Sequence, residues 1–429
     1  EHSLVLPKEF GVGFFFAKKS LKEQLQNDLK KIFKLENLKV ICFRNVPVNL
    51  SVLGEEAKDT LPEIFQAFLE QEDASNEMSL SSSLFQALKI IENKYLDYEE
   101  LYVCSLSSET IVYKGLMMPE GLKNFYLDIK NKKFKASTCL FHQRFSTNTE
   151  PKWHLAQPFR LLAHNGEINA IRGNRNWAKA RSSLFKSSLL PDLHKFENLI
   201  NADGSDSSAL DNMIQLLVEG GMNLFRAIRA VIPPAWQNIQ ILDPDVRAFH
   251  EYNSMHMEAW DGPAGIALAN KRYALSFLDR NGMRPSRYQI EKDGTVTIAS
   301  ETGVNPVPAS KIETKGRISP GGIFAVDKVA GKILTESDID QELAAKYPYR
   351  DWLKQNSSYI ESNLVQSEGL GLKKISPKKY TLATKIFSLF LEERTSVIKV
   401  LGVSAQEGTG SMGCLLYTSP SPRDVEESR

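Results

Sequence analysis

The 429-residue sequence contains little cysteine and no long apolar run. Its four cysteines lie far apart, so they form neither a CxxC pair nor the dense framework of a disulfide scaffold. The seven histidines show no HExxH or HxH pattern, so no metal site can be assembled locally. The apolar stretches are far shorter than the roughly 20 residues of a membrane-spanning helix. These absences predict a soluble protein of a reducing compartment without metal chemistry.

An excess of charge of either sign is also missing. Lys and Arg total 53 against 52 Asp and Glu, so no overall field attracts nucleic acid or an anionic membrane. The hydrophobic share of 42% and the charged share of 24% are typical of globular proteins. At roughly 150 residues per domain, the length predicts two or three domains. An enzyme or a binding module with a large core therefore remains.

The first third of the sequence alternates apolar runs with amphipathic stretches. Two runs separated by only Ser107 and Ser108 favour a β-hairpin. The patterns predict strands at residues 10–17, 39–44, 100–106 and 109–115, and helices at residues 19–34 and 81–95.

Residues 262–334 are mostly β in pattern. Asp293-Gly294 stands between two alternating runs, which is a strong hairpin signal. We predict strands at residues 265–269, 272–278, 287–291 and 295–300, and helices at residues 207–219 and 223–231. Antiparallel hairpins interleaved with helical pairs indicate a layered α+β domain. A polar stretch at residues 351–379 is typical of a connector, and residues 380–400 form an amphipathic helical pattern.

Polar residues follow two apolar runs between residues 138 and 181. We expect TCLFHQ to end a strand at Arg144 and RLLAHN to end a neighbouring strand at Asn165. An Arg side chain suits a carboxylate ligand, and an Asn-Gly pair offers a side-chain amide and an unshielded backbone N–H to an oxyanion. Each pattern alone also fits a structural ion pair or a turn. His164 fits a packed histidine better than a catalytic base.

Five longer strings carry more information together than these residues do singly. They are HQRFSTNTEPKWHLAQPFRLLAHNGEINAIRGNRNW, SDSSALDNMIQLL, VIPPAWQN, MEAWDGPAGIAL and LDRNGMRPSRY. In this order and spacing, they resemble the glutaminase region of the glutamate synthase large subunit. The resemblance extends from about Gly11 to Leu353.

The resemblance implies a class II glutamine amidotransferase domain. Its fold would be the α+β, four-layer αββα sandwich of the N-terminal nucleophile hydrolases. The nucleophile of that class is an N-terminal cysteine whose own α-amino group serves as the base. No Ser-His-Asp constellation is then required.

The same resemblance assigns roles to five residues. Arg144 and Thr147 would hold the α-carboxylate of glutamine. Asn165 and Gly166 would form the oxyanion hole, and Asp206 would pair with the α-ammonium group of the substrate. Opposite charges at the two ends of the amino-acid group would select glutamine over a simple amide.

The WDGP string and the run Asp279 to Tyr288 match the family as scaffold. Asn281-Gly282 fits a turn. The arginines in this run could join loops, face a neighbouring domain or bind phosphate, although no Gly-rich loop leads into a helix as in a P-loop.

The sequence departs from the family at the nucleophile. Glu1 is not cysteine, and we expect Cys42, Cys104 and Cys139 to be small buried hydrophobes in strands. We therefore interpret the chain as an N-terminally truncated fragment, inactive alone.

We predict four segments along the chain. Residues 1–345 would form the amidotransferase domain, residues 346–379 a linker, and residues 380–413 the start of the central domain of a glutamate synthase. Residues 414–429 would form an unrelated or artefactual tail. The resemblance implies FMN and an iron–sulfur cluster in the full-length parent, and no cofactor in this fragment.

The parent would hydrolyse glutamine and channel ammonia to 2-oxoglutarate, making glutamate. Its partners would be its own central, FMN-barrel and β-helix domains, and ferredoxin or a pyridine-nucleotide-linked subunit. The compartment would be the cytoplasm or a plastid stroma. Two alternatives stay open: a non-catalytic glutamine-sensing module on the same fold, and a stand-alone amidotransferase of another pathway, which the long segment between Arg144 and Asp206 disfavours.

Overall fold

The computed structural model describes most of the chain. The described residues are 6–73, 78–143, 150–201, 204–237, 239, 242–358, 376–387, 389–391 and 393–405. Within these ranges, no helix has the length and apolar character needed to cross a bilayer.

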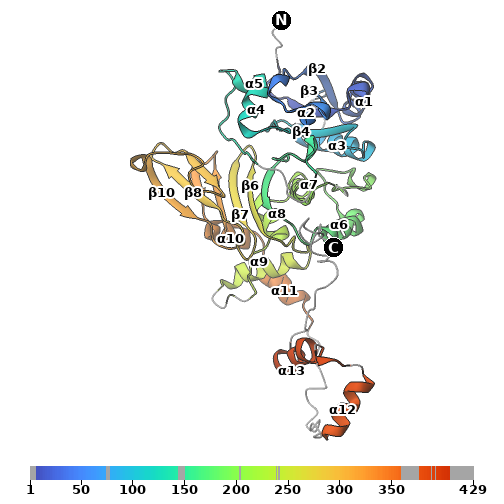
Figure 1. Cartoon of the computed structure of the whole chain (residues 1–429), viewed down its shortest axis with the longest axis vertical. Coiled ribbons are helices and arrows are strands. Elements are labelled where there is room, and N and C mark those ends of the chain that lie inside the picture. The colour runs from blue at the N-terminus through green and yellow to red at the C-terminus, as the bar shows by residue number, and fades with distance from the viewer. Residues whose placement is uncertain are drawn as a thin grey trace.

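An antiparallel sheet of four strands forms the N-terminal layer, at the top of Figure 1. Its strands, in the order β2-β3-β1-β4, are β1 (Gly11–Ala17), β2 (Leu38–Asn45), β3 (Glu63–Gln71) and β4 (Leu101–Ser107). Helices α1 (Lys22–Leu35) and α3 (Leu80–Lys94) connect the strands and contact each other. This order is the split βαβ arrangement of ferredoxin-like folds. It confirms the strands predicted at residues 10–17 and 39–44 and both helices.

The predicted hairpin after β4 is wrong, because residues 109–115 form no strand. Side-chain oxygens hold the backbone there instead. The Ser107 hydroxyl accepts hydrogen bonds from the N–H groups of Glu109 and Thr110, and the Ser105 hydroxyl accepts one from Val112. Such local bonds offer the backbone an alternative to a β-ladder.

A second, five-stranded antiparallel sheet forms what we call the site layer. Its strands, in the order β12-β11-β7-β6-β5, are β5 (Leu162–Gly166), β6 (Ala264–Ala269), β7 (Tyr273–Leu278), β11 (Ile323–Asp327) and β12 (Lys332–Leu334). We include helices α7 (Asp206–Glu219) and α8 (Leu224–Val231) with this sheet in the site layer. Helix α7 contacts β5. A smaller sheet beside it contains β8 (Arg287–Glu291), β9 (Val296–Ala299) and β10 (Ile312–Arg317). The strands and helices predicted between residues 207 and 300 are therefore confirmed.

The Asp293-Gly294 turn between β8 and β9 follows its prediction. Gly294 has φ +86°, and its N–H donates to the carbonyl of Glu291 at 2.9 Å. The Asp293 side chain accepts from the N–H of Thr295 at 2.9 Å. Glycine adopts this left-handed conformation without steric cost.

The remaining helices lie around and beyond these layers. They are α2 (Glu55–Asp59), α4 (Pro119–Phe125), α5 (Leu127–Lys130), α6 (Ile171–Arg181), α9 (Pro244–Ser254), α10 (Glu336–Ala345), α11 (Tyr349–Asn356), α12 (Pro377–Ile386) and α13 (Lys399–Ser404). Although α11 falls inside the predicted linker, it packs against α9 with Tyr349 buried. By contrast, α12 and α13 contain no buried residue. The predicted domain limits stay predictions.

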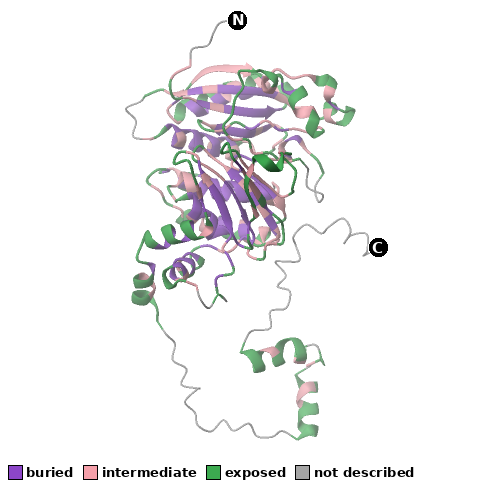
Figure 2. Ribbon diagram, turned by 90° about the vertical axis from the view of Figure 1, so that its left-hand side faces the viewer, coloured by how far each residue is buried: buried purple, intermediate pink, exposed green. Residues whose placement is uncertain are grey.

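One hydrophobic core joins the two layers. Apolar side chains of α3, such as Leu84 and Leu88, belong to the same buried cluster as Leu210 and Ile214 of α7. Figure 2 shows buried strands in both layers, with buried helical residues between them. The predicted α+β class is confirmed by this combination of helices and antiparallel sheets.

Candidate active site

Asn165 and Gly166 end strand β5, at the edge of the five-stranded sheet. Gly166 pairs with Ala264 of β6 and has φ +145°. A Cβ atom at this position would lie 1.7 Å from the carbonyl oxygen of Pro263, so no other residue fits without moving the backbone. The Asn-Gly pair is thus fixed by close approach of the β5 and β6 backbones.

The N–H groups of β5 alternate between the sheet and its open edge. The N–H of Glu167 donates to Pro263 O across the ladder. The N–H of Leu162 donates instead to the Asp211 carboxylate at 3.1 Å, and that of His164 to the Gln157 side chain at 2.7 Å. Because strand N–H groups alternate with a period of two, that of Gly166 points to the same open edge. This is the direction an oxyanion hole needs.

Asp206 is the first residue of α7. Its N-cap, Ser205, accepts a hydrogen bond from Ser208 N and so fixes the start of the helix. The Asp206 carboxylate accepts from the N–H of Ile168 at 2.7 Å and from that of Ser207 at 2.7 Å. It therefore lies beside the loop that leaves Gly166. The Ser207 hydroxyl donates a third hydrogen bond to the Asp206 carboxylate at 3.2 Å. A carboxylate has about four lone-pair sites, so these three bonds leave capacity for an ammonium group.

The buried side chain of His164, on β5, contacts Ser207 of α7. Its Nδ1 lies 2.8 Å from the Ser207 hydroxyl, and its ring is buried. Burial lowers the pKa of His164 below its usual value, although the nearby Asp206 carboxylate acts in the opposite direction. A neutral, buried imidazole agrees with the packed role expected from the sequence.

Asn165, Gly166 and Asp206 line one cavity of about 540 Å³. The structure thus brings together three of the five residues singled out by the resemblance. Arg144 and Thr147 lie outside the described residues. Gln143, directly before Arg144, lines the same cavity.

The predicted strand leading to Arg144 is wrong within its described part, because residues 138–143 form no strand. Phe141 is 58% exposed, so this segment lacks the covered face that stabilises a β-strand. The segment instead lines the cavity beside the open edge of β5.

The three described cysteines occupy different environments. Cys104 is buried, as predicted, and burial raises its pKa to about 12. Cys42 is half-buried, and burial raises its pKa as well. Cys139 is exposed and lines the cavity, so the prediction of a small buried hydrophobe is wrong for this residue. Cys414 lies outside the described residues.

The loop after β7 is held by its own side chains. The Asp279 carboxylate accepts from the N–H groups of Ala264 at 2.9 Å and Asn281 at 3.0 Å. Gly282 has φ +60°, which agrees with the predicted turn. Arg280 forms an ion pair with Asp261 at 2.6 Å, as expected for a residue that joins loops. Among the described residues, no three His, Cys, Asp or Glu side chains group as metal ligands would.

Sequence comparison defines the class of protein to which this site belongs. The family described as "Glutamine amidotransferases class-II" matches residues 1–352, and the chain belongs to this family. The N-terminal nucleophile fold expected from the resemblance is confirmed by this membership.

Glutamate synthases are among its curated relatives. A chloroplastic ferredoxin-dependent glutamate synthase of Oryza sativa subsp. japonica is 37% identical over 412 residues, covering 94% of this chain and 25% of the relative. The large chain of the Bacillus subtilis glutamate synthase [NADPH] is 38% identical over 356 residues, covering 81% and 23%. The chain thus spans about a quarter of the length of these relatives. The resemblance to glutamate synthases seen in the sequence is confirmed.

Among solved structures, a glutamine phosphoribosylpyrophosphate amidotransferase from B. subtilis is also similar. It is 19% identical, with a TM-score of 0.28, and the match covers 46% of this chain and 33% of that one.

Proposed function

We propose that this chain is the glutaminase part of a glutamate synthase, which releases ammonia from glutamine and delivers it to 2-oxoglutarate. The observation that supports this most is the convergence of Asn165, Gly166 and Asp206 on one cavity. Membership of the class II amidotransferases supports glutamine as the ammonia source. The likeness to glutamate synthases supports the fate of the ammonia.

The geometry suggests how glutamine would lie. Its side-chain carbonyl oxygen would face the Gly166 N–H and the Asn165 amide, while its α-ammonium group would face Asp206. Arg144 and Thr147 would hold the α-carboxylate. Preorganised donors that face the carbonyl oxygen stabilise the negative charge that develops there in the tetrahedral intermediate.

The nucleophile would be a cysteine at the mature N-terminus of the parent protein. Its thiol would give its proton to its own α-amino group, and the thiolate would attack the side-chain carbonyl carbon of glutamine. Collapse of the intermediate would release ammonia and leave a glutamyl thioester. Water would then hydrolyse the thioester to glutamate and restore the thiol. Cys104 is unsuited to this role because it is buried with a raised pKa.

This chain would accordingly bind glutamine without turning it over. FMN and the iron–sulfur cluster would belong to domains of the parent outside this chain. Ferredoxin or a pyridine-nucleotide-linked subunit would supply the electrons there, in the cytoplasm or a plastid stroma. Residues 380–413 would begin the central domain, since the described helices α12 and α13 contain no buried residue.

A calorimetric titration of the chain with L-glutamine, paired with the sequence of the upstream coding region, tests this proposal. Saturable binding together with an in-frame upstream segment that begins CGVGF-like would support it. Binding in a complete gene without such a cysteine would instead support a glutamine sensor on the same fold. Absence of glutamine binding would contradict both functions.

A further inference from the structure

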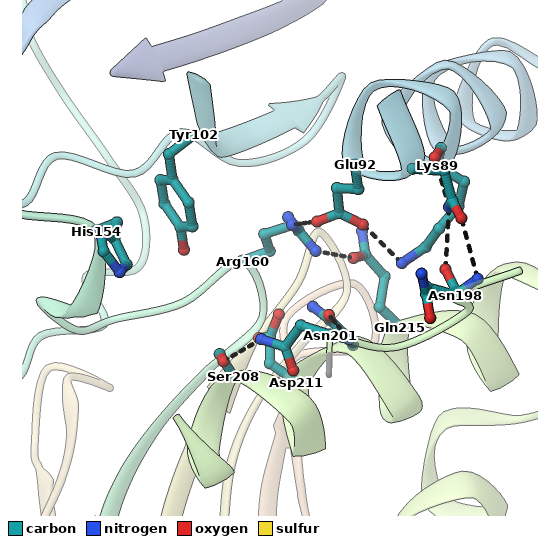
Figure 3. A network of polar contacts seen from close by, with 12 residues as sticks. Lys89, Glu92, Tyr102, His154, Arg160, Asn198, Asn201, Ser208, Asp211 and Gln215 are labelled. Carbon is teal, nitrogen blue, oxygen red and sulfur yellow. Dashed lines mark hydrogen bonds and ion pairs between the residues drawn. The ribbon is translucent and has the colours of Figure 1, made fainter. Parts of the chain in front are cut away.

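A buried network of charged side chains lies where the two layers meet. Lys89 and Glu92 come from α3 of the N-terminal layer, Arg160 precedes β5, and Asp211 lies on α7. Lys89 and Asp211 are each 1% exposed, and Arg160 is 9% exposed. Figure 3 shows Lys89 and Glu92 reaching from α3 toward the segments that enter the site layer. The proposed glutamine chemistry uses none of these groups.

The first half of the network stabilises the chain segment that leads into β5. The Arg160 guanidinium forms an ion pair with Glu92 and donates a hydrogen bond to the Gln215 side chain at 3.2 Å. The next two backbone N–H groups, of Leu161 and Leu162, donate to the Asp211 carboxylate at 2.8 and 3.1 Å. The strand that begins here ends at Asn165 and Gly166.

The second half holds the segment that leads into α7. Lys89 Nζ donates to the carbonyl of Leu199 at 2.9 Å and forms an ion pair with Glu92 at 2.8 Å. Asn93 and Asn198 exchange two hydrogen bonds, each 3.0 Å long, between side chain and backbone. This segment continues toward Asp206, the first residue of α7. Side chains of helix α3 thus form hydrogen bonds or ion pairs with both chain segments that lead to the candidate site.

The charges in the network depend on one another. Burial alone would raise the pKa of Glu92, but attraction to Arg160 and Lys89 lowers it below its usual value. Removing one member of such a buried group leaves the others unpaired, which is far more costly than losing a surface ion pair. The local structure around Arg160 should therefore respond sharply to a change on α3.

We propose that α3 positions the glutamine site, with Glu92 and Arg160 as positioning residues for Asn165 and Gly166, and with Asn93 as a positioning residue for Asp206. The N-terminal layer then has a role beyond packing, because it sets the distance between the oxyanion hole and the ammonium-binding carboxylate. The inference rests on the proposed function for its consequence on glutamine, but its structural content can be measured without substrate.

The test compares three variants of the whole chain by amide hydrogen exchange and by glutamine calorimetry. Glu92→Gln removes the charge that Arg160 faces. Asn93→Ala is a milder change that removes no charge and releases Asn198 and the backbone carbonyl of Lys89. Asp340→Asn is the matched control, since Asp340 forms a buried ion pair with Arg229 at 2.8 Å between α10 and α8. All measurements are made well below the melting temperature of each variant.

We expect Glu92→Gln to raise the exchange rates of residues 161–166 at least tenfold and to weaken glutamine binding at least fivefold. Asn93→Ala should raise exchange in residues 198–201 and 204–206 and leave residues 161–166 unchanged. Asp340→Asn should lower the melting temperature without either effect. Unchanged exchange at residues 161–166 in Glu92→Gln, at a melting temperature lowered as in the control, would overturn the inference. If the wild-type chain bound no glutamine, the proposed function would fail while the exchange data still decided the positioning role.

Discussion

Among single residues, Gly166 and Gly173 are two glycines whose replacement by alanine should change the free energy of unfolding in opposite directions. Gly166→Ala would place a Cβ atom 1.7 Å from Pro263 O at φ +145°, whereas Gly173 in α6 has open space around it. We expect Gly166→Ala to lower the free energy of unfolding by at least about 2 kcal/mol, because strained backbone alone costs about 1–3 kcal/mol. Gly173→Ala should raise it by about 0.5–1 kcal/mol, as expected inside a helix. Urea unfolding of both variants checks the prediction, and equal effects would contradict it.

Asp206 should govern affinity through its charge. Asp206→Asn keeps the shape and the helix start but removes the negative charge that would face the α-ammonium group of glutamine. We expect glutamine binding to weaken by about 1.5–3 kcal/mol, the range of a charge-assisted hydrogen bond. Calorimetry measures this loss. Asp243→Asn, which changes the N-cap of α9 outside the cavity, is the control and should bind as the wild type does.

Individual residues also show which features of the site could not be predicted from the sequence. Asn165 and Asp206 could be named because their motifs are specific, and the structure places both on one cavity. The exposed position of Cys139 could not be foreseen, since an apolar local sequence does not reveal whether a neighbouring element covers it. Asp211 was missed as the acceptor for the start of β5, although it stands in the same motif as Asp206. Only the fold brings these segments together.

At the scale of elements, strong local signals predicted structure well. The helix α7 and the β8–β9 hairpin follow directly from apolar spacing and from Asp-Gly. Strand β3 was missed because it is a largely buried central strand, between β1 and β2, whose apolar residues do not alternate strictly. The segment 109–115 has a composition typical of β-strands. The N–H groups of Thr110 and Val112, however, donate hydrogen bonds to serine hydroxyls and not to a neighbouring strand. Tertiary pairing, which decides such cases, is not encoded in a local window.

The contact between α3 and α7 should depend on pH through Glu219. Its carboxylate accepts a hydrogen bond from the Ser81 hydroxyl, and burial raises the pKa of Glu219 to about 7. Because the folded pKa exceeds the unfolded one, the contribution to stability is fully present below about pH 4.5 and is lost as the pH rises through 7. Glu219→Gln should therefore gain about 1–3 kcal/mol relative to wild type between pH 5 and pH 8.

Urea unfolding at the two pH values measures this difference. Glu251→Gln, at an exposed position of α9, should show the same small effect at both. A Glu219→Gln effect independent of pH would mean that Glu219 is charged in the folded protein at both pH values.

At the scale of the whole molecule, the common core of the two layers predicts one cooperative unit that ends near α11. The described residues of α12 and α13 are not buried, and several large apolar side chains there are exposed, such as Ile386 at 66% and Val403 at 80%. We expect a chain that ends at Ser358 to melt within about 2 °C of the full chain, since a 1 kcal/mol change shifts a large domain by only about 2–4 °C. It should also aggregate less. A large loss of stability in scanning calorimetry would show that the C-terminal helices belong to the folded body.

The proposed function depends on a single glutamine-binding site at the end of β5 and the start of α7. A crystal structure of the chain with bound L-glutamine tests it most directly. We predict the side-chain carbonyl oxygen of glutamine within hydrogen-bonding distance of the Gly166 N–H and the Asn165 amide, and the α-ammonium group against Asp206. Glutamine bound away from these three residues, or with its ends reversed between them, would contradict the proposed site.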